Sequence, residues 1–285
     1  MYLDNLKNIT KDLHKKSKED EIGLNLSLFF SNMFDSDFST DNIMLDSGIA
    51  ISPNAAKNCV LEHLRLVRFV KAVHNSVNKL LSKKDNINIV YVGCGTYAPL
   101  LNSVLHFFNK EQLNATVLDV NKESLRYAKD TYNKIYNNTY NVEFIEDDGS
   151  KYKHSNKVDL LISECMYAGL ILEPQYFIYD NFKCQMSDIG IMIPKKVSLY
   201  IDDELITSLS IKEDLKKEIT LNNKNKDVVL KTIVNVDDKN TLKYKDTTIT
   251  KDIHLITKET LKGAKKVIYR YVLNPFPKWS FKIIK

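Results

Sequence analysis

Glycine is scarce in this chain of 285 residues: only eight occur, together with six prolines and a single tryptophan. Arginine is scarcer still, so lysines spread along the chain carry most of the positive charge behind the net charge of +5. Lysine lacks the planar fork of donors that contacts bases and phosphates bidentately. We therefore interpret the charge as a solvated surface and expect no nucleic-acid partner.

The chain also lacks a hydrophobic run long enough to span a membrane, and MYLDNLKNITKDLHKK at the start lacks the apolar stretch of a secretory signal. None of the four cysteines has CxxC spacing, which disfavours a metal site or a disulfide framework: Cys59, Cys94, Cys165 and Cys184. We expect a cytoplasmic protein with no metal and no membrane partner.

Buried strands alternate with helical segments through the middle of the chain. The strands are expected at 87–93, 115–120, 142–147, 158–163 and 189–194, and the helices at 53–81, 99–109, 121–137 and 173–186. Ser52 can cap the first of these helices. This alternation predicts α/β architecture, a Rossmann-like doubly wound parallel sheet.

After Pro194 the apolar residues recur with a period of two, which predicts an antiparallel β half-barrel. We therefore expect three parts: an N-terminal helical cap over 1–82, a Rossmann-like ligand-binding domain over 83–194 and an antiparallel β substrate domain over 195–285. The aromatic segment 24–38 is read either as a short helix packed on the body or as a lid.

Ligand-type residues follow three successive strands. Gly93 and Gly95 come directly after the first strand, where glycine permits a close backbone approach to a ligand. The second strand ends in Asp119-Val120, and a carboxylate there can accept both ribose hydroxyls. The third ends near Asp148-Gly149, where an acid can accept from an adenine amine. Together these residues predict a nucleoside site at the carboxyl edge of the sheet.

Two glutamates, Glu164 and Glu173, flank the loop after the fourth strand. A loop of this length can fold back and present both carboxylates to one cation, and a guanidinium offers the planar fork that two carboxylates can orient. The alternative is that Glu164 pairs locally and Glu173 favours the first turn of the next helix.

These motifs resemble the class I S-adenosylmethionine-dependent methyltransferases, whose glycine motif here reads YVGCGTY. Within them, SECM with a second glutamate nine positions after the first resembles the double-glutamate loop of the protein arginine methyltransferases. The spacing of Glu62, Arg65 and Phe69 is also similar to a helix of that family.

The resemblance implies a cofactor, S-adenosyl-L-methionine, whose carboxylate pairs with Arg65. It also implies that Glu164 and Glu173 are catalytic, that Glu164 contacts the cofactor too, and that Met166 and Tyr167 bind substrate. The implied reaction is N-methylation of a guanidine or amine nitrogen, on a small molecule or an arginine residue.

Departures from the family pattern keep alternatives open. Tyr91 and Tyr97 stand where an acid and a third glycine are usual, Cys165 replaces a tryptophan, and the Thr-His-Trp element has only Trp279 as a remnant. The alternatives are aminocarboxypropyl transfer or cyclisation, which release methylthioadenosine, and a decayed cofactor-binding protein. Residues 195–285 are short for a full barrel plus a dimerisation arm, so the oligomeric state stays open, with a dimer as one option.

Overall fold

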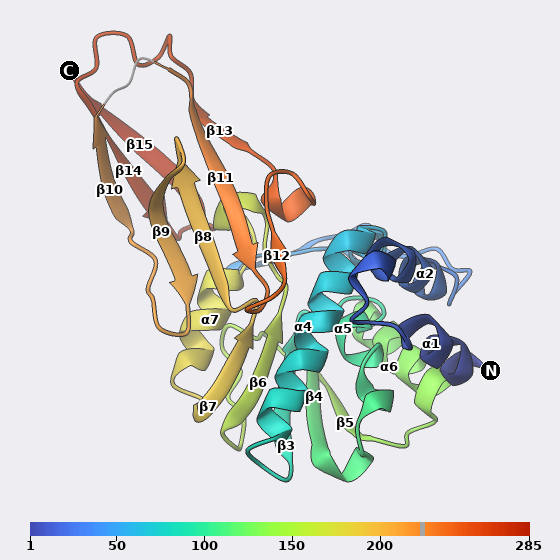
Figure 1. Ribbon diagram of the computed structural model, residues 1–285. Helices are drawn as coiled ribbons and strands as arrows, with labels where there is room; N and C mark the ends of the chain where they lie inside the picture. The colour runs from blue at the N-terminus through green and yellow to red at the C-terminus, as the bar shows by residue number, and fades with distance from the viewer. Residues whose placement is uncertain (223–225) are drawn as a thin grey trace.

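The computed structural model describes residues 1–222 and 226–285, and Figure 1 shows their arrangement. Before the central sheet, the chain forms helices, a 3-10 turn and a short hairpin: α1 (Tyr2–Thr10), η1 (Lys16–Lys18), α2 (Glu19–Ser31), β1 (Ile43–Leu45), β2 (Gly48–Ala50), α3 (Pro53–Cys59) and α4 (His63–Leu81).

A five-stranded parallel sheet forms the centre of the molecule. Its strands are β3 (Ile87–Val92), β4 (Leu113–Asp119), β5 (Asn141–Glu146), β6 (Val158–Ser163) and β7 (Met186–Ile193). Their order is β5-β4-β3-β6-β7. The chain passes from β3 through β4 to β5 and then crosses to the other side of β3, where it forms β6 and β7, so the strand order reverses between the neighbours β3 and β6. Ligands of open α/β sheets bind at this switch point, outside the carboxyl ends of the strands. The doubly wound prediction is confirmed.

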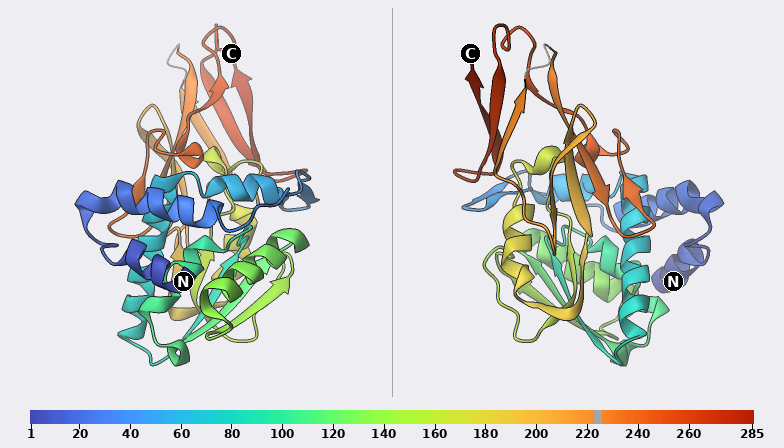
Figure 2. Two further views of the ribbon diagram at one scale, coloured as in Figure 1. Left: turned by 90° about the vertical axis from the view of Figure 1, so that its right-hand side faces the viewer. Right: turned by 60° about the vertical axis from the view of Figure 1, so that its left-hand side comes forward.

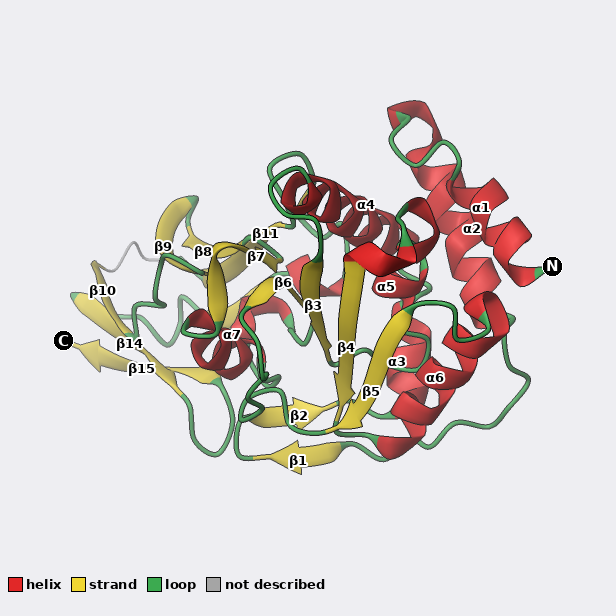
Figure 3. Cartoon of the chain, turned by 90° about the horizontal axis from the view of Figure 1, so that it is seen from below, coloured by secondary structure: helices red, strands yellow, loops and turns green. Residues whose placement is uncertain are grey.

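Helices cover both sides of this sheet, and Figure 3 shows α4 and α7 on opposite sides. The remaining helical elements of this part are α5 (Pro99–Asn102), η2 (Leu105–Phe107), η3 (Lys110–Gln112), α6 (Lys122–Tyr136), η4 (Ala168–Leu170) and α7 (Gln175–Lys183). Asn121 caps α6 by accepting from the backbone amides of Glu123 and Ser124. None of the helices in the described ranges is both long and apolar enough to cross a membrane.

The helix predicted over 53–81 is broken in two, which corrects the sequence interpretation. Ser52 caps α3 as expected, by accepting from the Ala55 amide. The chain leaves the helix after Cys59 because side chains satisfy its last carbonyls: Ser27 donates to Val60 O and Arg65 donates to Cys59 O. The predicted 99–109 helix likewise shortens to α5 and η2.

The C-terminal region consists of two antiparallel sheets, as the period of two predicts (Figure 2). Its elements are β8 (Lys196–Ile201), β9 (Glu204–Ser210), β10 (Glu218–Asn222), β11 (Val228–Asn235), β12 (Thr241–Leu242), η5 (Thr248–Thr250), β13 (Ile253–Ile256), β14 (Lys266–Val272) and β15 (Lys278–Ile284). One sheet has the order β12-β11-β8-β9, with β13 also paired to β11, and the other has the order β10-β14-β15.

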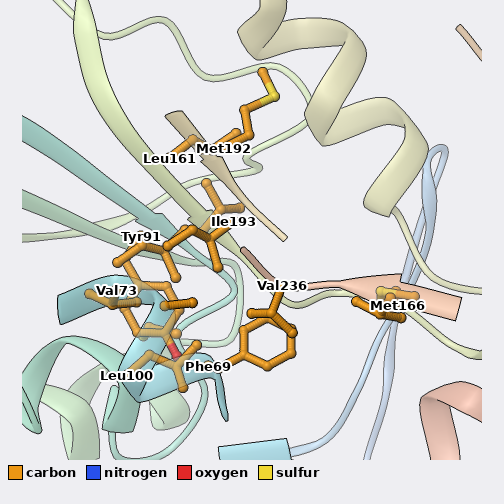
Figure 4. Packing of buried hydrophobic residues seen from close by; sticks show 14 of the residues in the cluster. Phe69, Val73, Tyr91, Leu100, Leu161, Met166, Met192, Ile193 and Val236 are labelled. Carbon is orange, nitrogen blue, oxygen red and sulfur yellow. The ribbon is translucent and has the colours of Figure 1, made fainter. Parts of the chain in front are cut away.

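The aromatic segment 24–38 packs against the body. Phe30 is fully buried, and the rings of Phe34 and Phe38 lie 4.9 and 4.7 Å from that of Tyr127 on α6. These contacts favour the packed helix over the lid. Phe69 of α4 and Tyr91 of β3 belong to the same hydrophobic core (Figure 4).

Candidate active site

A cavity opens at the carboxyl ends of the parallel strands, beside the switch point. Its lining includes every residue that the sequence assigns to cofactor binding or catalysis: Arg65, Gly93, Gly95, Asp119, Val120, Asp148, Gly149, Glu164 and Glu173.

The backbone geometry of the turn after β3 requires glycine at two positions. Gly93 and Gly95 have φ angles of +62° and +63°, in the left-handed region that favours glycine. A Cβ on Gly93 would lie 2.1 Å from the Cys165 sulfur, and one on Gly149 would lie 2.1 Å from Val92. Glycine is therefore required at Gly93 and Gly149 because neighbouring side chains occupy the place of a Cβ, which lets the strand ends pack closely.

Asp119 holds the glycine turn from the end of β4. One carboxylate oxygen accepts from the Gly95 amide at 3.0 Å, and the other accepts from the Asn121 amide at 2.9 Å. Burial raises the pKa of Asp119, while these backbone bonds oppose the rise. The Cys94 thiol also donates to the oxygen that binds Gly95, at 3.9 Å. The other oxygen keeps a second lone pair, which can still accept from a ribose hydroxyl.

The β5 end is organised by its own side chains. Asp148 accepts from the Ser150 amide at 2.9 Å, and Asp147 accepts from the Asp148 amide at 2.7 Å. This closed turn presents Asp147, Asp148 and Gly149 along one wall of the cavity. The turn thus places carboxylate acceptors in the lining of the cavity.

Arg65 enters the cavity from the first turn of α4. Its guanidinium is buried, donates to Cys59 O at 3.1 Å and lies 3.4 Å from Glu62 and 3.8 Å from Glu164. A buried guanidinium with donors to spare fits the carboxylate of an amino-acid cofactor.

Glu164 and Glu173 line the same cavity from opposite ends of the loop after β6. Burial raises the pKa of Glu164 to about 7, with Arg65 opposing the rise. Burial and the Glu164 charge raise the pKa of Glu173 to about 8. Two carboxylates that resist ionisation near neutral pH form a site that a cation would relieve.

The two residues assigned to substrate binding lie elsewhere. Met166 is buried in the core (Figure 4), and the ring of Tyr167 faces the ammonium of Lys251 at 4.2 Å. Within the described part of the chain, neither of them lines the cavity. The loop turns between Glu164 and Met166, so neighbouring side chains point to different sides.

Sequence reasoning missed the β1–β2 hairpin, whose residues Leu45, Ile49 and Ala50 line the cavity. Figure 3 shows this hairpin at the edge of the molecule, outside the strand ends. The Ile49 amide donates to Leu172 O at 2.8 Å, which ties the hairpin to the double-glutamate loop. The signal was the Asp-Ser-Gly turn between two short apolar runs.

Residues 63–169 match a family model described as PRMT5 arginine-N-methyltransferase. That segment is less than half of the chain; it includes Arg65 and Glu164 and ends before Glu173. No curated protein matches the chain.

Two solved structures share the fold. A PRMT1 enzyme–prozyme heterotetrameric complex with AdoHcy from Trypanosoma brucei is 12% identical, with a TM-score of 0.52 over 78% of this chain and 95% of that one. Protein arginine methyltransferase 10 from Arabidopsis thaliana is 10% identical, with a TM-score of 0.53 over 77% of this chain and 94% of that one. The chain thus resembles the protein arginine methyltransferases in sequence over residues 63–169, and it shares the fold of two of their solved structures.

Proposed function

We propose that the protein transfers a methyl group from S-adenosylmethionine to a guanidine or amine nitrogen held between Glu164 and Glu173. The observation that carries this proposal is that both carboxylates line the same cavity as the glycine turn and Arg65. A cofactor against the turn and a cation at the carboxylates would therefore be neighbours.

The chain's own residues supply binding and orientation. Arg65 would hold the cofactor carboxylate, Asp119 the ribose hydroxyls, and Asp148-Gly149 the adenine edge. When bound, S-adenosylmethionine supplies a methyl group on a sulfonium, which is already a good leaving group. The protein therefore needs alignment more than a strong base.

Glu164 and Glu173 would bind the cationic acceptor and take up the proton that its nitrogen loses. Their pKa values of about 7 and 8 lie near neutral pH, where a group exchanges protons most effectively. Two ionised oxygens on a guanidinium also fix its plane, which aims one nitrogen toward the glycine turn.

A screen with labelled cofactor tests the proposal. Free arginine, other guanidines, amines and arginine-containing peptides would each be offered, and the cofactor-derived product would be identified by mass spectrometry. S-adenosylhomocysteine together with a methylated acceptor is the expected result. Methylthioadenosine would instead indicate the aminocarboxypropyl or cyclisation chemistry, and cofactor binding without any product would indicate a decayed site.

We also propose a cytoplasmic location. All four cysteines are free thiols in the structure, as a reducing compartment favours. Fractionation of cells that express a tagged chain would test this location.

A further inference from the structure

The loop between the two glutamates has an unusual backbone. Gly169, Leu170 and Leu172 all have positive φ angles, of 75°, 56° and 67°. Leucine rarely adopts such angles, because its Cβ approaches the neighbouring carbonyl oxygen. A conformation of this kind persists only where surrounding contacts determine it.

Two aromatic residues of the C-terminal β region supply such contacts. Tyr271 of β14 and Trp279 of β15 are direct cross-strand partners, with ring centroids 5.1 Å apart. The Tyr271 hydroxyl donates to Leu170 O, and the Trp279 indole donates to Gly169 O at 3.0 Å. One cross-strand pair thus binds two consecutive carbonyls of the loop.

The loop amides are bound by the same region. The Gly169 amide donates to the Thr232 hydroxyl of β11 at 2.7 Å, and the Leu172 amide donates to Pro277 O at 2.7 Å. Thr232 and Tyr271 are buried, so the hydrogen bonds that these two side chains make to Gly169 and Leu170 are shielded from competing water. Strands from both antiparallel sheets therefore contact one short segment between Glu164 and Glu173.

We propose that Thr232, Tyr271 and Trp279 are positioning residues that hold the loop so that Glu164 and Glu173 face one acceptor. This inference rests on the proposed function. Two carboxylates brought together repel each other, so a free loop would relax and separate them. The aromatic pair and the threonine oppose that relaxation, and small displacements of aligned groups reduce rate strongly.

The double variant Tyr271→Phe with Trp279→Phe tests the inference, because it keeps both rings and removes both donors. We expect its kcat for a guanidine acceptor to fall roughly 10- to 100-fold. Its Kd for the cofactor should stay within about twofold of wild type, since the pair contacts no residue assigned to the cofactor. Tyr269→Phe, a buried tyrosine of the same strand, is the matched control and should behave as wild type.

Hydrogen exchange gives a readout that does not depend on activity. The amides of 168–172 should exchange faster in the double variant, while those of β3 and β4 keep their protection. If the double variant does not fold, Thr232 provides a second test. Thr232→Val should produce the same effects, because it removes the hydroxyl, and Thr232→Ser should largely restore wild-type behaviour. Wild-type exchange together with a kcat within twofold of wild type would overturn the inference. A wild-type protein that methylates no guanidine or amine would instead overturn the proposed function, and the exchange result would still report on the loop.

Discussion

The guanidinium of Arg65 lies 3.8 Å from the carboxylate of Glu164, so the residue expected to bind the cofactor also contacts one of the residues expected to bind the acceptor. Arg65 opposes the rise in the pKa of both Glu164 and Glu173. A change at this single side chain should therefore affect both halves of the site.

Replacing Arg65 should weaken cofactor binding and shift the pH profile. We expect Arg65→Ala to raise the Kd for S-adenosylmethionine by tenfold or more, about 1.4 kcal/mol, because a charge-assisted bond in a buried site is lost. The half-maximal pH of kcat/KM should also move upward, because the carboxylates lose a nearby cation. Calorimetry and a pH series measure the two effects. Arg126→Ala, at an exposed pair with Asp130, is the control; an unchanged Kd in Arg65→Ala would remove Arg65 from the cofactor site.

Stability should fall as pH rises through the range in which Glu164 and Glu173 ionise. Their pKa values of about 7 and 8 in the folded chain lie above the ordinary value of 4.5, so the folded state keeps protons that the unfolded state has released. Glu173→Gln removes one of these groups, so its gain in Tm over wild type should be larger at pH 8.5 than at pH 5. Thermal melts at the two pH values measure this; an equal gain at both would show that Glu173 has an ordinary pKa.

With a cationic acceptor, activity should rise with pH over the range in which stability falls. Ionised carboxylates bind the cation and protonated ones do not, so kcat/KM should rise between about pH 6 and pH 8 and then level off. A profile that is flat across this range would separate acceptor binding from the two glutamates.

The glycine turn should not tolerate alanine. Gly93→Ala combines a positive φ with a Cβ 2.1 Å from the Cys165 sulfur, whereas Gly95→Ala has the same φ but 3.3 Å to Ala56. Both should be destabilised by roughly 1–2 kcal/mol from the backbone alone, and Gly93→Ala should lose more. Adding Cys165→Ala should recover part of the extra loss in Tm only at Gly93. Equal stability of the two glycine variants would argue against the close approach of Cys165.

Asp119 should matter to the cofactor and not to the acceptor. Asp119→Ala removes the acceptor of the Gly95 amide as well as the expected ribose contact. We expect a Kd for the cofactor at least tenfold higher, about 1.4 kcal/mol, with the acceptor KM at saturating cofactor little changed. Cofactor binding as tight as in wild type would place the ribose elsewhere.

The strand ends were predictable because each carries its own local signal. Gly93, Asp119 and Glu164 each stand at or just after the end of a largely apolar segment, and parallel strands bring such ends to one edge of a sheet. The half-barrel was predictable from its period of two. Arg65 could be assigned only because the spacing of its helix resembles a helix of the family, since most arginines on helices form surface or interhelical ion pairs.

The rest depends on contacts between distant segments. The break after Cys59 depends on Ser27 and Arg65, and sequence periodicity alone continues through it. Met166 and Tyr167 were assigned from the motif, but the loop's positive φ angles after Tyr167 depend on contacts from β11, β14 and β15. The hairpin that lines the cavity has strands too short to show a period of two.

Under the proposed function, Glu164 and Glu173 together hold a cationic nitrogen beside the methyl donor. Methyl transfer from labelled S-adenosylmethionine by Glu164→Gln and Glu173→Gln, with the exposed Glu111→Gln as control, tests it most directly. Each active-site change keeps the shape and removes the charge, so turnover should fall by about 100-fold or more while the Kd for the cofactor stays within about threefold. Wild-type turnover in either variant would contradict the claim.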